Sequence, residues 1–146
     1  MNTFQQAIEF VLKWEGKYVN DPKDPGGETN YGIAKRSHPN VDIKNLSLVD
    51  AVAIYKREYW DFYRLYNASL PLCIVLLDGY VQHRPNVMKQ MAEVAGEDWK
   101  LLIQTRIQFY LRLIQKNPEL IRFKKGWLNR MNDLSKYCTI ILEQQK

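Results

Sequence analysis

The sequence has few of the residues that build disulfide frameworks and metal sites. It contains two cysteines and two histidines in 146 residues. Two cysteines are too few for a disulfide framework, and Cys73 and Cys138 lie in apolar helical settings, so we expect buried free thiols. His38 and His83 are isolated, and no Cys/His spacing suggests zinc or a Cys–His nucleophile. We therefore expect a protein that needs neither a metal nor another cofactor.

Long apolar runs are also missing. Residues 70–77 form an apolar run that falls well short of the roughly 20 residues needed to cross a bilayer, and Asp78 ends it. The N-terminus lacks the basic and apolar regions of a signal peptide, because Glu9 and Lys13 interrupt its apolar stripe. The sequence therefore predicts neither a transmembrane segment nor a signal peptide.

Strand signals are weak throughout, whereas helical signals recur along the chain. Apolar residues at helical spacing predict helices over about 3–15, 47–62, 71–79, 85–95, 99–116 and from 126 onward. Ser47 with Asp50 suits a helix start, and Pro71 and Pro85 suit first helical turns. The length suits one domain with a real core. We predict an all-α fold of about six helices in a single globular unit, residues 1–146.

The first predicted helix ends on a carboxylate that lies on its buried stripe. Phe4, Ile8 and Val11 recur at helical spacing, and Glu15 follows Val11 by four residues. Gly16 then stands where a left-handed C-cap is usual. Apolar neighbours and the negative end of the helix dipole would raise the pKa of the Glu15 carboxyl, as a general acid requires near neutral pH. The alternative is a solvated glutamate in a fraying last turn.

The segment after this helix is a bent polar loop that holds further carboxylates. Residues 21–22 and 24–27 read Asp-Pro and Asp-Pro-Gly-Gly, which are turn sequences, so we expect Asp21 and Asp24 to be exposed and ionised. Glycoside hydrolysis needs one carboxylic acid with a raised pKa, which protonates the leaving oxygen. It also needs one carboxylate with an ordinary pKa, which orients water or stabilises charge. The alternative is that both aspartates only cap the loop through Asx-turns.

Residues 15–33 resemble the N-terminal signature of the glycoside hydrolase family 108 lysozymes (N-acetylmuramidases), many of them phage endolysins. The family's Glu-Gly-Gly-Tyr is present as Glu-Gly-Lys-Tyr at 15–18, and its Asp-Pro-x-Asp-x-Gly-Gly-x-Thr-x-x-Gly-Ile run follows at 21–33. The resemblance implies that Glu15 is the catalytic acid. Lys17 stands where the family usually has glycine, which places a cation near that acid.

A second group of phage lysozymes carries Glu, Asp and Thr in the same order. Asp24 keeps that group's spacing of eight intervening residues after Glu15, whereas Thr29 comes one residue early. This looser resemblance implies that Asp24 stabilises charge or acts as a base. It also implies that Thr29 positions a water molecule.

Aromatic side chains in and around this loop are candidate sugar contacts. Tyr31 is the strongest candidate because it lies within the loop, and Tyr18 and Asn30 complete the predicted substrate-binding set. For any single aromatic residue, Trp60 and Trp127 included, a place in the core is the alternative.

The second half of the chain resembles a peptidoglycan-binding region in degenerate form. The family's Arg-x-x-Phe-Tyr and Gly-Trp-Leu-Asn-Arg segments are present at 106–110 and 126–130. Its Asp-x-x-x-Asn-x-Gly motif keeps only Asp78, because Gln82 and Arg84 replace the Asn and the Gly.

We therefore divide the chain into a catalytic half, residues 1–68, and a helical half, residues 69–146, that resembles the binding region. Arg106 and Arg130 could equally pair with a core carboxylate such as Asp78. For that reason we assign neither arginine to the glycan.

The resemblance implies a peptidoglycan hydrolase that cleaves the β-1,4 bond between N-acetylmuramic acid and N-acetylglucosamine. The net charge of +5 suits an anionic partner such as peptidoglycan. Alternatives are a lytic transglycosylase, a wall-binding module without catalysis and a basic nucleic-acid-binding protein. Basic residues are scattered and no helix-turn-helix can be placed, so we expect no nucleic-acid partner. We expect a monomer, made in the host cytoplasm, that reaches the periplasmic wall after membrane permeabilisation.

Overall fold

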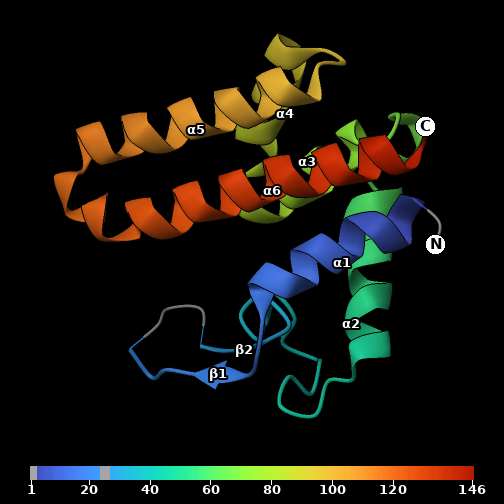
Figure 1. Cartoon of the computed structure of the whole chain (residues 1–146). Coiled ribbons are helices and arrows are strands. Elements are labelled where there is room, and N and C mark those ends of the chain that lie inside the picture. Colours follow the sequence, from blue (N-terminus) through green and yellow to red (C-terminus); the bar gives the residue numbers. More distant parts are fainter. Residues whose placement is uncertain (1–2, 24–26) are drawn as a thin grey trace.

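Helices make up most of the structure, a computed structural model that describes residues 3–23 and 27–146 (Figure 1). The α-helices of these residues are α1 (Thr3–Glu15), α2 (Leu48–Tyr55), α3 (Leu72–Gln82), α4 (Pro85–Ala95), α5 (Trp99–Lys116) and α6 (Lys124–Gln144). Shorter helical segments are η1 (Lys56–Asp61), η2 (Leu65–Asn67) and η3 (Pro118–Phe123). No helix in the described parts of the chain is both long and apolar enough to span a bilayer. The predominantly helical fold confirms the predicted class.

Helix boundaries agree with the sequence where a cap or a proline sets them. The Ser47 hydroxyl accepts a hydrogen bond from the Asp50 amide at 3.1 Å and caps α2, as predicted. Pro85 is the first residue of α4, where its missing N–H costs nothing. The end of α5 at Lys116 leaves one residue before Pro118, which cannot continue a helix.

The second predicted helix differs from expectation in its last turns. The sequence predicts one helix over 47–62, but α2 passes at Lys56 into η1, which is a π-helix. The wider turn of a π-helix explains why the aromatic residues of this segment fall at mixed spacings. As a result, Trp60 is buried in the core, whereas Phe62 remains 71% exposed.

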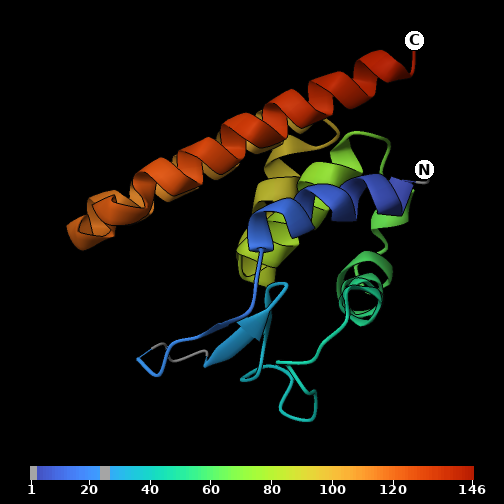
Figure 2. The same cartoon turned by 60° about the horizontal axis from the view of Figure 1, so that its bottom comes forward.

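A small antiparallel sheet was missed by the all-α prediction. Its strands β1 (Val19–Asn20), β2 (Glu28–Asn30) and β3 (Ile33–Ala34) pair in the order β1-β2-β3. Asn30 and Ile33 face each other across the turn that joins β2 to β3. Strands of two or three residues have too few alternating positions to be recognised from pattern. Figure 2 shows the sheet projecting beyond the C-terminal end of α1.

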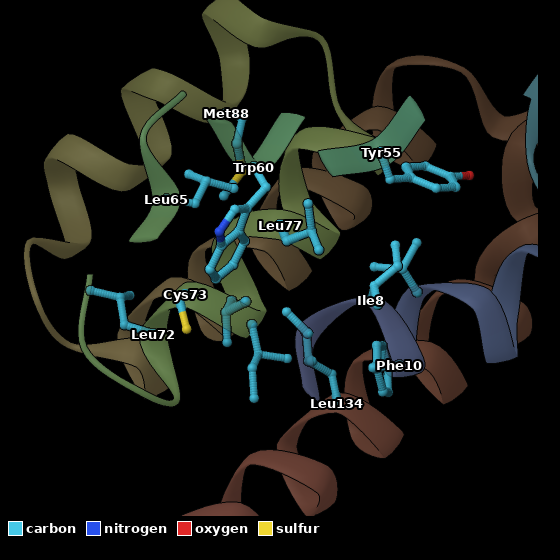
Figure 3. Packing of buried hydrophobic residues seen from close by; sticks show 14 of the residues in the cluster. Ile8, Phe10, Tyr55, Trp60, Leu65, Leu72, Cys73, Leu77, Met88 and Leu134 are labelled. Atoms are coloured by element: carbon cyan, nitrogen blue, oxygen red, sulfur yellow. The ribbon is translucent and has the colours of Figure 1, made fainter. Parts of the chain in front are cut away.

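One hydrophobic core holds the helices of both halves together. Helix α1 packs against α3 and α6, so the first helix lies among the last ones. Figure 3 shows Ile8 and Phe10 of α1 beside Leu77 of α3 and Leu134 of α6. Helices from the middle and the end of the chain therefore hold α1 in place.

The two cysteines are fully buried free thiols, as predicted. Burial raises the pKa of the Cys73 thiol to about 11, and it also raises the pKa of Cys138. Both side chains therefore pack as small apolar groups.

Candidate active site

Glu15 ends α1 at a point where α3 and α6 also reach it. Its Oε1 accepts a hydrogen bond from Gln82 Nε2 at 2.8 Å and another from Arg130 Nη1 at 3.1 Å. The side chain is 19% exposed. Oε2 accepts no hydrogen bond from residues 3–23 or 27–146. One carboxyl oxygen is thus held in place, and the other is available to a ligand.

The surroundings of Glu15 are more polar than its place on an apolar stripe predicts. An amide and a guanidinium, 67 and 115 residues away in sequence, contact it, and Arg130 forms an ion pair with it at 3.1 Å. The periodicity of a helix reports which face is buried, but not which polar groups other helices bring to that face. The prediction that Glu15 has apolar neighbours is therefore wrong for its Oε1 atom.

A tight turn of the sheet packs closely against the Glu15 side chain. Tyr31 and Gly32 link β2 to β3 with φ angles of 51° and 80°, the positive values of a two-residue type I′ turn. A Cβ at Gly32 would lie 2.9 Å from the Cβ of Glu15 and would overlap the Tyr55 hydroxyl. That hydroxyl donates to the Tyr31 carbonyl at 2.7 Å. Burial, and then the Glu15 carboxylate, raises the pKa of Tyr55, which keeps it a donor.

We expect Gly32→Ala to destabilise the protein by about 2–4 kcal/mol, because it combines left-handed backbone strain with steric overlap. Gly16→Ala is the matched control, since Gly16 also has a positive φ of 66° at the end of α1 but has nothing within 4 Å of an added Cβ. The control should cost only about 1–2 kcal/mol. Urea unfolding of both variants measures the difference. Equal losses would show that the turn does not press on Glu15.

The other predicted catalytic residues lie in or near the sheet. Thr29 is half-buried in the middle of β2. Asp24 lies outside the described residues, so its role stays a prediction. Asp21 is exposed, as predicted, and its Oδ1 accepts the Lys23 amide at 2.9 Å, which is the Asx-turn of the alternative interpretation.

The predicted substrate-binding residues differ in accessibility. Tyr18 is partly exposed, and Tyr31 is half-buried in the turn beside Glu15. Asn30 is only 8% exposed, and its side-chain amide donates to the Ile43 carbonyl at 3.0 Å. This contact ties the long segment after β3 to the sheet. We therefore leave Asn30 out of the proposed binding set, and the roles of the two tyrosines stay predictions.

Glu28 is a carboxylate of this region that sequence reasoning did not single out. Its Oε2 accepts a hydrogen bond from the Tyr18 hydroxyl at 2.6 Å, and this bond raises the pKa of Tyr18. The contact joins β2 to the segment that follows Glu15. The available signal was its place directly before Thr29 in the family motif, at a position where the motif accepts any residue.

A buried network of charged side chains contacts Glu15 through Arg130. Arg130 binds Asp78 Oδ1 through Nη2 at 2.6 Å and Nε at 3.1 Å, and Arg106 Nη2 binds Asp78 Oδ2 at 2.8 Å. These contacts bear out the pairing of both arginines with Asp78. Burial by itself would raise the pKa of Asp78, but the charges of Arg106 and Arg130 outweigh it and hold the pKa below its ordinary value.

His83 lies at the opposite end of this network from Glu15. Its Nε2 accepts a hydrogen bond from Arg106 Nε at 3.0 Å. Burial, and then the charge of Arg106, lowers the pKa of His83 to about 3, so the imidazole is neutral and serves as an acceptor. Hydrogen bonds therefore connect His83 to Glu15 through Arg106, Asp78 and Arg130.

Two cavities meet at the end of α3. One of about 660 Å³ lies beside η1, and the other, of about 410 Å³, lies between α3 and the α5–α6 pair, with Trp127 in its wall. Gln82, His83 and Arg84 line both cavities. Because Gln82 donates to Glu15, each cavity comes within one side chain of the carboxyl group.

Comparison with known proteins finds a family model and a solved structure that match this chain. The family model of Glycosyl hydrolase 108 matches residues 8–83, which include Glu15, the sheet and Gln82. The solved structure of SagA from Brucella abortus superposes with a TM-score of 0.70 and 26% sequence identity, over 92% of this chain and 93% of that one. No curated protein matches the chain.

Proposed function

We propose that this chain, which belongs to the glycosyl hydrolase 108 family, cleaves the β-1,4 bond between N-acetylmuramic acid and N-acetylglucosamine. Membership of the family makes it a peptidoglycan hydrolase of the lysozyme type. The observation that carries this proposal is a carboxyl group held by two hydrogen bonds and separated from two cavities by one side chain, Gln82. Gln82 and Arg130 fix one oxygen of Glu15 and leave Oε2 without a partner in the described residues.

In the proposed mechanism, Glu15 donates a proton from Oε2 to the leaving glycosidic oxygen. The two hydrogen bonds on Oε1 restrict the rotation of the carboxyl group, so that the proton points in one direction. Asp24 stabilises the positive charge that develops on the sugar or acts as a base, and Thr29 positions the water that completes hydrolysis. Tyr18 and Tyr31 contact the glycan from the sheet side.

The wider setting in this proposal follows the sequence expectations. The protein acts as a monomer on bacterial peptidoglycan, without a cofactor and without a nucleic-acid partner. It is made in the host cytoplasm and acts in the periplasm after the membrane has been permeabilised. Residues 1–68 carry the catalytic carboxyl groups, and residues 69–146 supply the partners that hold Glu15.

Mass spectrometry of digested cell walls tests the proposed reaction. A hydrolase releases fragments that contain one added water, whereas a lytic transglycosylase releases anhydro fragments that lack it. We expect the hydrated products, together with clearing of a turbid wall suspension. Anhydro products would favour the transglycosylase alternative. Salt-sensitive duplex binding without any clearing would favour the nucleic-acid alternative instead.

A further inference from the structure

The cavity beside η1 has an aromatic lining that the proposed catalysis does not use. Tyr63 stacks on Tyr80 with ring centroids 4.0 Å apart, and Phe62 meets Tyr63 edge-on at 4.9 Å. Phe62 is 71% exposed, so its ring adds little to the core. Large exposed aromatic rings at the rim of a cavity are typical of a surface that a ligand covers.

This cavity comes within one side chain of the candidate acid. Gln82 lines it and donates to Glu15 Oε1 at 2.8 Å, and Tyr59 lines it next to Tyr55, with ring centroids 5.7 Å apart. Tyr55 in turn donates to the turn that presses on Glu15. A saccharide whose linkage lies at Glu15 would therefore continue into this cavity.

Two arginines lie at the same cavity, and they differ in their partners. Arg57 is 3.3 Å from Glu58, which also contacts His38 at 2.9 Å. Arg84 is exposed between α3 and α4 and forms no ion pair within the described residues. A free guanidinium can bind a carboxylate through two parallel N–H···O bonds, which makes it selective for that group.

We propose that this cavity is a subsite for an N-acetylmuramic acid residue that carries its stem peptide. The aromatic side chains contact the sugar, and Arg84 binds a carboxylate of the peptide. A volume of about 660 Å³ lies within the range of roughly 300–1,000 Å³ of ligand pockets. This inference rests on the proposed function, and it adds that the enzyme distinguishes peptide-bearing glycan from bare glycan.

The test compares glycan strands that carry stem peptides with strands from which an amidase has removed them. We expect Arg84→Ala to lower kcat/KM about tenfold or more on peptide-bearing strands, and to change it less than about twofold on bare strands. Arg122→Ala is the matched control, because Arg122 is also exposed but lies on η3, outside the cavity lining. It removes the same charge and should affect neither substrate selectively.

A second variant tests the aromatic part of the subsite. Phe62→Ala should raise KM several-fold on both substrates with kcat retained, whereas Tyr66→Ala, which removes an exposed aromatic ring outside the lining, should not. Equal effects of Arg84→Ala on both substrates, or no effect on either, would overturn the proposed peptide recognition. A wild-type protein that cleaves neither substrate would contradict the proposed function itself, so the two failures can be told apart.

Discussion

Replacing Glu15 by glutamine is expected to lower the rate of wall hydrolysis by about 100- to 10,000-fold, the usual contribution of a positioned general acid. The amide oxygen of glutamine can still accept the hydrogen bonds of Gln82 and Arg130, so the side chain should keep its place. What the variant loses is the carboxyl proton. Clearing of a wall suspension and mass spectrometry of the products measure the loss.

A matched control separates this chemical effect from an effect on folding. Glu9→Gln makes the same change on the exposed face of the same helix and should leave hydrolysis unchanged. Thermal unfolding of the Glu15 variant should remain close to that of the wild type, because Arg130 keeps its two hydrogen bonds to Asp78. Normal hydrolysis in the Glu15 variant would end the proposal and would make Glu28 the next carboxyl group to test.

The helices could be predicted from the sequence because their signals are local. An apolar stripe over 8 to 21 residues, with Ser47, Pro85 or Pro118 at an end, leaves little freedom in where a helix lies. The strands of two and three residues contain no such pattern. The I′ turn at Tyr31-Gly32 stabilises them, and a turn without flanking alternation does not identify a hairpin.

The position of Glu15 could be predicted, but its partners could not. In the sequence, Gln82 stands out only because it replaces an Asn of the family motif, yet its amide donates directly to Glu15. The sequence leaves a pairing of Arg130 with Asp78 open, and the structure shows this pairing, but nothing in the sequence predicts the third contact of Arg130, to Glu15. These contacts depend on how α1 packs against α3 and α6, which a pattern along one helix does not contain.

The same contacts bear on how the two halves of the chain cooperate. Glu15 belongs to residues 1–68, whereas Gln82 and Arg130 belong to residues 69–146. The candidate site is therefore assembled between the halves. We infer that the helical half positions the acid through these two residues.

Asp78→Asn is expected to be the most destabilising single change in this network, at about 3–5 kcal/mol. Asp78 is fully buried and is the counter-charge of two arginines. Without it, Arg130 would keep only its ion pair with Glu15, and Arg106 would be buried with no partner carboxylate among the described residues. Urea unfolding should show an earlier midpoint with an unchanged slope. Asp61→Asn is the control, because it breaks an ion pair with Lys56 in which both side chains are about half exposed. Such a pair contributes about 1 kcal/mol or less.

Acid titration gives the Asp78 prediction a second readout. The pKa of Asp78 in the folded protein lies below its ordinary value of 3.8, so the unfolded chain binds its proton first as the pH falls. The stabilisation by Asp78 is therefore complete above pH 3.8 and is lost as the pH falls through the folded pKa. The difference in unfolding free energy between wild type and Asp78→Asn should shrink over that range.

A difference in unfolding free energy at neutral pH that is no larger for Asp78→Asn than for Asp61→Asn would contradict this prediction. It would show that the charges of Asp78, Arg106 and Arg130 do not hold α3 to α5 and α6. In that case Asp78 would not be what fixes Arg130 beside Glu15, and the orientation proposed for the acid would lose its support.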